Sequence, residues 1–202
     1  MNCMQVNYRL LLISFLISFA AYSCSEPPNK LNFLSISTTI LAIGDSLTYG
    51  TGANKGEDYP ALLAKLTNIN IINAGVPGEV SSKGLKRLPA LLDKHVPELV
   101  IPIHSGNDIL RKLPRHELKN NLSAMIELAK SRNIQIIMLG VPEPGIFLKS
   151  ADIYEQVANE NNIPVELSLL PKIFGNNSLK SDIAHFNAQG YKILAEGIYE
   201  FL

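Results

Sequence analysis

A serine, an aspartate and a histidine occur in two short segments of this sequence that could together perform acyl transfer. The first segment, Gly44-Asp45-Ser46-Leu47, directly follows a short apolar run. The second segment, near the other end of the chain, contains Asp182 and His185, which are three residues apart. A serine hydroxyl becomes a nucleophile when a histidine accepts its proton and a carboxylate orients that histidine. The pattern predicts Ser46 as nucleophile, His185 as base and Asp182 as the orienting group, on a helical turn that places both side chains on one side.

Two further segments could donate hydrogen bonds to the negative charge that such a reaction creates. Gly75 lies in a turn rich in glycine and proline and would offer its backbone N–H, because glycine allows a substrate to approach closely. Asn107, within Ser105-Gly106-Asn107-Asp108, would offer its side-chain amide. Together with the N–H of Ser46, these groups predict an oxyanion hole with three donors.

Each segment alone also has an ordinary structural explanation. Asp45 or Ser46 could cap a helix, Gly75 could simply make a turn, and Asn107 could stabilise its own loop. Asp182 and His185 could be a solvated surface pair. The catalytic interpretation is favoured because all four segments occur together, at spacings that alternate with predicted strands.

The elements that must position these residues follow from alternating apolar and amphipathic stretches after Thr38. This alternation predicts a parallel sheet covered on both faces, which is a three-layer α/β/α sandwich with a mainly parallel five-stranded sheet and a flavodoxin-like build. Reactive groups in such sheets gather beyond the carboxyl ends of the strands, so Ser46, Gly75 and Asn107 should meet at one edge. The predicted strands are 39–43, 69–74, 99–103, 134–139 and 165–167, and the predicted helices are 59–66, 85–95, 118–132, 151–161 and a last one from about residue 188.

The four segments resemble the SGNH, or GDSL-type, hydrolase family, whose name lists the residues matched here by Ser46, Gly75, Asn107 and His185. The resemblance covers residues 38–202 and is closest to small bacterial periplasmic enzymes that act as thioesterase, lysophospholipase and arylesterase in one. It implies an esterase for carboxylic ester or thioester bonds that works through an acyl-enzyme on Ser46, with no metal and no cofactor. A carbohydrate O-deacetylase of the same family and a catalytically silent, membrane-tethered binding domain remain alternatives.

Some residues near the predicted site depart from the family pattern or have an open role. Ser105 stands where the family usually has glycine and is strained if the backbone there needs a positive φ. Phe186 stands where the family usually has proline and is expected to add apolar surface beside the site. His104 either contacts substrate or is a buried structural histidine. Ile146 and Phe147, in the loop after the fourth strand, are expected to bind the acyl chain of the substrate, as this region does in related enzymes.

The N-terminal segment has the pattern of a secretory signal. Arg9 precedes an apolar run over residues 10–22 that is too short for a confident membrane span. The residues before Cys24 resemble a bacterial lipoprotein cleavage site, so lipidation of Cys24 and ordinary cleavage at the same place both remain open. We expect a signal peptide over 1–23, a tether over 24–37 and a hydrolase domain over 38–202, in an exported, periplasmic protein that lipidation of Cys24 would attach to a membrane.

Composition sets the remaining limits. The chain has 202 residues with 47% hydrophobic content, which suits one well-buried domain. Its 18 basic and 18 acidic residues give a formal net charge of +0 without a basic run, which argues against binding of nucleic acid. The cysteines, Cys3 and Cys24, both lie in the N-terminal segment, so no disulfide is expected in the folded body. The expected partner is a small acyl ester or lipid, and the sequence specifies neither the physiological substrate nor the oligomeric state.

Overall fold

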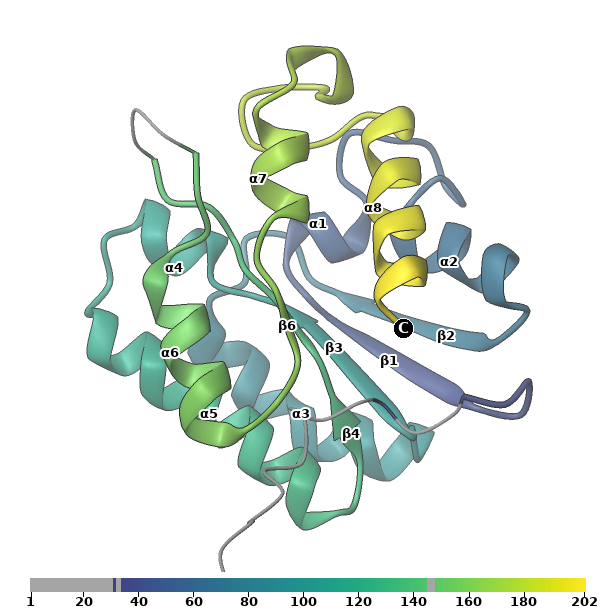
Figure 1. Cartoon of the computed structure of the whole chain (residues 1–202), viewed down its shortest axis with the longest axis vertical. Coiled ribbons are helices and arrows are strands. Elements are labelled where there is room, and N and C mark those ends of the chain that lie inside the picture. The colour runs from purple at the N-terminus through teal and green to yellow at the C-terminus, as the bar shows by residue number, and fades with distance from the viewer. Residues whose placement is uncertain (1–30, 32–33, 145–147) are drawn as a thin grey trace, which may run out of the picture.

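A parallel sheet runs through the centre of the molecule and has helices on both faces (Figure 1). The structure, a computed structural model, describes residues 31, 34–144 and 148–202. The strands are β1 (Thr39–Gly44), β2 (Asn70–Gly75), β3 (Leu99–Ile103), β4 (Gln135–Ile136), β5 (Met138–Leu139) and β6 (Val165–Glu166). The helices are α1 (Ser46–Tyr49), α2 (Tyr59–Thr67), α3 (Ser81–His95), α4 (Gly106–Leu110), α5 (Arg115–Ser131), α6 (Asp152–Asn161), α7 (Leu169–Phe174) and α8 (Ala188–Phe201), with a 3-10 turn η1 (Asn177–Leu179).

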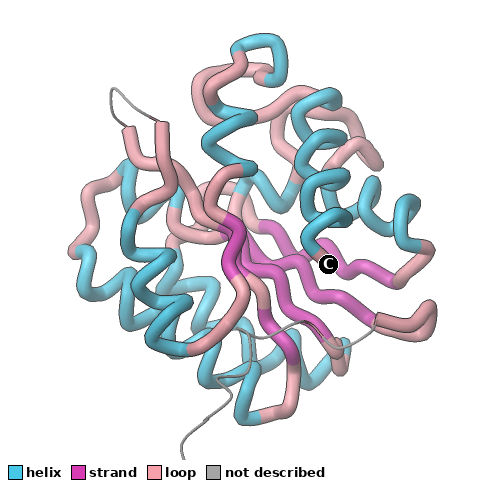
Figure 2. Tube along the Cα trace, viewed as in Figure 1, coloured by secondary structure: helices cyan, strands magenta, loops and turns pink. Residues whose placement is uncertain are grey.

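The sheet register brings the ends of three strands together. The strand order is β2-β1-β3-β4, and every pair is parallel. Gly44, the last residue of β1, pairs with Gly75 of β2 on one side and with Ile103 of β3 on the other. The strands lie side by side in Figure 2. The loops that follow β1, β2 and β3 therefore leave the sheet at the same edge, as the sequence predicts.

The predicted fourth strand is divided into β4 and β5, and Pro102 explains the division. The Ile137 N–H donates to the Val100 carbonyl of β3 at 3.2 Å. The next backbone N–H of β3 that would face β4 belongs to residue 102, but this residue is a proline and has no N–H. Beyond Ile137 the chain pairs with β6 instead of β3, and Met138 lies opposite Val165. The five predicted strands are thus present as a four-stranded sheet continued by the β5–β6 pair, and the α/β fold is confirmed.

The helices form the two outer layers. α3, α5 and α6 pack together along one face of the sheet, and α2, α7 and α8 pack along the other (Figure 1). In α5 the buried residues recur at the three- and four-residue spacing of an amphipathic helix; they are Leu118, Leu122, Met125, Ile126 and Ala129. β1 lies between the layers and is buried almost throughout. This burial gives the central strand a fixed position from which its final turn can present a side chain.

Several predictions about the N-terminal segment and one loop lie outside the described residues. These are the signal peptide, Cys24, and the substrate contacts of Ile146 and Phe147. Leu31 and Leu34, which belong to the expected tether, pack against the hydrophobic core. Within the described part of the chain, each helix is too short or too polar to cross a membrane.

Candidate active site

Ser46 stands at the tight turn between β1 and α1. The Asp45 side chain caps α1 by accepting a hydrogen bond from the Leu47 N–H at 3.1 Å. Gly44 allows the turn, because a Cβ there would lie 2.1 Å from Thr48 Oγ1. Ser46 is therefore the first residue of α1, two residues beyond the carboxyl end of the central strand, where the sequence predicts a nucleophile.

The structure brings Ser46, His185 and Asp182 into one hydrogen-bonded chain. The Ser46 hydroxyl lies 3.0 Å from His185 Nε2. The other ring nitrogen, Nδ1, lies 2.8 Å and 3.0 Å from the two carboxylate oxygens of Asp182. When Nδ1–H donates to the carboxylate, Nε2 is left free to accept the serine proton. Ser46 and His185 are half-buried, whereas Asp182 is exposed.

Asp182 and His185 are joined by a loop rather than by the predicted helical turn. Asp182 Oδ1 accepts hydrogen bonds from the backbone N–H of Ala184 at 2.7 Å and of His185 at 2.9 Å. The hydrogen bond from the His185 side chain, followed by that from the Ala184 N–H, lowers the pKa of Asp182 below its ordinary value. The carboxylate is therefore held both in place and in its ionised form.

Phe186 anchors this loop in the core. Its side chain is fully buried and packs edge-on against Phe174, with ring centroids 4.7 Å apart, and against Tyr191 at 5.5 Å. The backbone of Ser181 also donates to the His185 carbonyl at 3.0 Å, which closes the loop on itself. Phe186 adds no exposed apolar surface beside the site, so that expectation is wrong. Its aromatic contacts instead hold the segment that carries His185.

Asn107 lies where β3 gives way to α4, beside the turn that carries Ser46. Its Nδ2 donates to Asp45 Oδ2 at 3.2 Å and to the Glu79 carbonyl at 3.1 Å.

Burial raises the pKa of Asp45, against smaller opposite effects from the Leu47 N–H, His104 and Asn107. Ser105, two residues before Asn107, has a φ of 105°, so the condition under which a serine is strained at this position is met.

The Gly75 N–H faces away from Ser46. It donates to Asn73 Oδ1 at 3.0 Å, whereas the N–H of the next residue, Val76, donates to the Gly44 carbonyl of β1. Neighbouring N–H groups of a strand point to opposite sides, and β2 is the edge strand of its sheet. A Cβ on Gly75 would lie 2.1 Å from the Tyr49 backbone nitrogen, so glycine is needed there for packing against α1. This geometry does not support Gly75 as an oxyanion donor.

Gly78 is better placed, and sequence reasoning missed it. Its carbonyl accepts from the Arg111 guanidinium at 2.9 Å, and the carbonyl of the following residue, Glu79, accepts from Asn107. Among the described residues, the backbone N–H groups of Gly78 and Ser46 have no acceptor.

Gly78 lies in a tight turn. It has a φ of 75°, and the Glu79 N–H donates to the Val76 carbonyl across Pro77-Gly78. That Pro-Gly pair is the signature of a type II turn and was the available signal.

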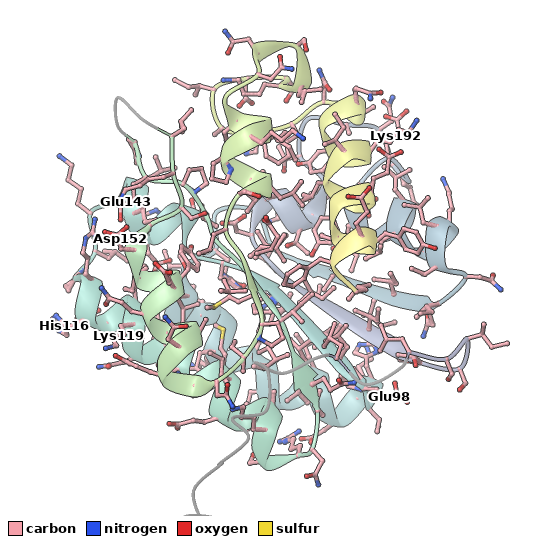
Figure 3. All side chains as sticks on the ribbon, viewed as in Figure 1. Glu98, His116, Lys119, Glu143, Asp152 and Lys192 are labelled. Carbon is pink, nitrogen blue, oxygen red and sulfur yellow. The ribbon has the colours of Figure 1, made fainter. Side chains whose placement is uncertain are left out.

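His104 and His116 are not part of the hydrogen-bonded chain of Ser46, His185 and Asp182. His104 is fully buried, and its Nε2 lies 3.3 Å from Glu79 Oε2, which agrees with a structural histidine rather than a substrate contact. His116 is exposed and lies on the outer side of α5, near Lys119 (Figure 3).

Comparison with known proteins places the chain among ester hydrolases. Residues 42–193 match the GDSL-like Lipase/Acylhydrolase family. The arylesterase of Vibrio mimicus is 30% identical over 162 residues, which are 75% of this chain and 76% of that protein. Thioesterase 1/protease 1/lysophospholipase L1 of Escherichia coli is 26% identical over 166 residues, 78% of this chain and 80% of the relative. The crystal structure of the psychrotrophic esterase EstA from Pseudoalteromonas sp., inhibited by monoethylphosphonate, superposes with a TM-score of 0.73 at 26% identity, covering 81% of this chain and 96% of EstA.

Proposed function

The chain belongs to the GDSL-like lipase/acylhydrolase family, and from this premise we propose that it hydrolyses esters and thioesters through an acyl-enzyme on Ser46. One observation carries the proposal. The Ser46 hydroxyl lies 3.0 Å from His185 Nε2, while Nδ1 of the same ring contacts the Asp182 carboxylate at 2.8 Å. Nucleophile, base and orienting carboxylate thus stand in the order that acyl transfer requires.

In the first half-reaction, Ser46 Oγ attacks the carbonyl carbon of the ester as His185 Nε2 takes the hydroxyl proton. The tetrahedral intermediate collapses when the bond to the leaving oxygen or sulfur breaks, and His185 gives that atom the proton. In the second half-reaction, His185 takes a proton from water, which attacks the acyl-enzyme. Release of the acid returns the proton to Ser46. Asp182 stays ionised and stabilises the positively charged ring in both halves.

We propose that Gly78, rather than Gly75, supplies a backbone donor to the oxyanion, together with the Ser46 N–H and the Asn107 side chain. The support is that the Gly78 N–H has no acceptor among the described residues, whereas the Gly75 N–H already donates to Asn73. The Asn107 amide has one hydrogen on the Asp45 carboxylate and one on the neutral Glu79 carbonyl. The oxyanion would share the hydrogen that faces the Glu79 carbonyl, because a hydrogen bond to a charged acceptor is the stronger.

The proposed substrates are acyl esters with an apolar acyl or aryl part. Large apolar side chains are exposed at the carboxyl edge of the sheet, where substrate must enter; they include Val76, Leu110, Leu113, Leu148 and Ile183. The relatives are named arylesterase and thioesterase/lysophospholipase, which fits this class. Ile146 and Phe147 remain proposed acyl-chain contacts. Export, with a signal peptide over 1–23 and Cys24 as a lipidation site, also remains a proposal.

The test compares the wild-type protein with Ser46→Ala on p-nitrophenyl butyrate. A matched control is Ser178→Ala, which removes an exposed hydroxyl bonded to Asn176. We expect Ser46→Ala to abolish hydrolysis and labelling by a fluorophosphonate, and Ser178→Ala to retain both. Equal hydrolysis by wild type and Ser46→Ala would refute the proposal. Acyl-chain length then separates the alternatives, because activity on acetyl esters alone would indicate a carbohydrate deacetylase.

A further inference from the structure

A buried ionic cluster lies directly behind the proposed oxyanion hole and takes no part in the reaction steps above. It consists of Glu79, Arg87 and His104, whose side chains are 6%, 24% and 0% exposed. The three residues come from the loop after β2, from α3 and from the end of β3. Buried charges are costly unless they are paired, so a cluster in this position calls for an explanation.

Arg87 ties the Glu79 carboxylate to the ends of two strands. Its Nε lies 2.9 Å from both carboxylate oxygens, and one terminal nitrogen lies 2.7 Å from Oε2. The same terminal nitrogen donates to the Ala74 carbonyl at 2.6 Å and to the Gly44 carbonyl at 3.3 Å. The hydrogens on these two nitrogens are shared among the acceptor oxygens, and the planar guanidinium suits this arrangement better than a lysine ammonium would.

The His104 ring lies against the same carboxylate without a hydrogen bond to it. Its Nε2 lies 3.3 Å from Glu79 Oε2, and the ring fits above Gly84 of α3, where a Cβ would lie 2.3 Å from Nε2. Burial raises the pKa of Glu79, but the neighbouring His104 ring and the Arg87 guanidinium outweigh it and leave the pKa below its ordinary value. Glu79 is therefore a fixed anion.

The backbone of Glu79 connects this cluster to catalysis. Its carbonyl accepts one Nδ2 hydrogen of Asn107 at 3.1 Å, while Asp45 Oδ2 accepts the other at 3.2 Å. These two acceptors orient the Asn107 amide so that its NH₂ group, rather than its oxygen, points toward Asp45 and Glu79. Glu79 also directly follows Gly78, so a shift of Glu79 would move both proposed donors.

We propose that Glu79, held by Arg87 and His104, is a positioning residue that sets the Asn107 amide and the Gly78 N–H for the oxyanion. This inference rests on the proposed function, because it assumes that Asn107 donates to a reaction intermediate. Glu79 acts through Asn107 and Gly78 and does not touch substrate. Its loss should lower kcat and leave KM unchanged, since the oxyanion exists only after the substrate has bound.

The test is a double-mutant cycle on p-nitrophenyl acetate. Losing one oxyanion donor typically costs about 10²–10³-fold in kcat, so we expect that loss for Asn107→Ala. We expect Glu79→Gln to lower kcat about tenfold or more with KM changed less than twofold. In the Asn107→Ala background, Glu79→Gln should lower kcat by clearly less than it does in the wild-type background, because one of the two donors that it positions is already gone. Multiplicative losses in the double variant would overturn the proposal, since a purely structural role predicts them.

Two further variants guard against misfolding. His104→Leu has a similar volume and removes only one of the supports, so it should show the same pattern with a smaller loss of kcat. Arg132→Lys is the control, because Arg132 pairs with Asp93 at 2.5 Å and donates to the Pro89 carbonyl away from the site. It should leave kcat unchanged. Equal kcat losses in His104→Leu and Arg132→Lys would count against the proposal.

A readout independent of turnover separates this inference from the proposed function. The side-chain ¹⁵N–¹H signals of Asn107 should be sharp in wild type and in Arg132→Lys, and broadened or shifted in Glu79→Gln and His104→Leu. Unchanged Asn107 signals in both cluster variants would overturn the positioning role even in an active enzyme. Altered signals in a protein without esterase activity would retain the positioning role and refute the proposed function alone.

Discussion

His185 Nε2 lies 3.0 Å from the Ser46 hydroxyl although 139 residues separate the two along the chain. Ser46 is fixed by the turn after the central strand, and His185 by a loop that Phe186 anchors in the core. Contact between them therefore requires β1, α7 and α8 to be packed together. The predictions below probe the groups that maintain this contact and the backbone that surrounds it.

Replacing Asp182 by asparagine should impair catalysis severely without unfolding the protein. The amide has nearly the same shape but no charge, and it can favour the wrong imidazole tautomer. We expect kcat to fall by about 10³–10⁴-fold, as for the equivalent change in serine proteases. The matched control is Asp152→Asn, since Asp152 is an exposed carboxylate on α6 that pairs with Lys149 at 2.8 Å (Figure 3). A loss below tenfold in Asp182→Asn would argue against its orienting role.

The stability contributed by Asp182 should depend on pH in a defined direction. Its pKa lies below the ordinary value of 3.8, chiefly through the hydrogen bond from His185. The contribution is therefore fully present above about pH 4 and is lost as the pH falls through the lower folded-state value. Thermal unfolding of wild type and Asp182→Asn should show a Tm difference that shrinks below pH 4. A difference that grows on acidification would contradict this sign.

Ser105→Gly should stabilise the protein. Ser105 has a φ of 105°, a conformation that costs a residue with a Cβ about 1–3 kcal/mol. Glycine removes this strain but adds entropy to the unfolded chain, so we expect a net gain of about 0.5–1 kcal/mol in the free energy of unfolding. Ser105→Ala also removes the unpaired Oγ but keeps the Cβ, so it should be less stable than Ser105→Gly. Chemical denaturation measures both variants, and a lower stability for Ser105→Gly would disprove the strain.

Gly75→Ala should destabilise the protein strongly, for a packing reason unrelated to hydrogen bonding. The new Cβ would lie 2.1 Å from the Tyr49 backbone nitrogen, so α1 would have to move. We expect a loss of about 3 kcal/mol or more, in the range of severe overpacking. Gly56→Ala is the control; it has a φ of 84° but nothing within 4 Å of its new Cβ, so it should cost only about 1–2 kcal/mol. Similar losses in the two variants would contradict the packing argument.

The sequence predicted the fold and the catalytic chain because both have local signals. Apolar runs mark β1, β2 and β3, and the residues after β1 and β3 carry Ser46 and Asn107. The geometry does not support the prediction that the Gly75 N–H is an oxyanion donor. The direction in which a backbone N–H points depends on the strand with which its own strand pairs, and the local sequence does not show this. The division of the fourth strand likewise depends on Pro102 in a different strand. No local pattern joins Glu79, Arg87 and His104, which meet only after the sheet and α3 have packed.

The loop that carries His185 is held by α7 and α8, the last helices of the chain, while Ser46 follows the first strand. A growing polypeptide that has already formed β1 to β3 thus still lacks the histidine that contacts Ser46. Esterase activity should therefore appear late in folding, when α7 and α8 pack against the rest of the domain. Fragments that end before residue 185 should therefore be unable to cleave esters.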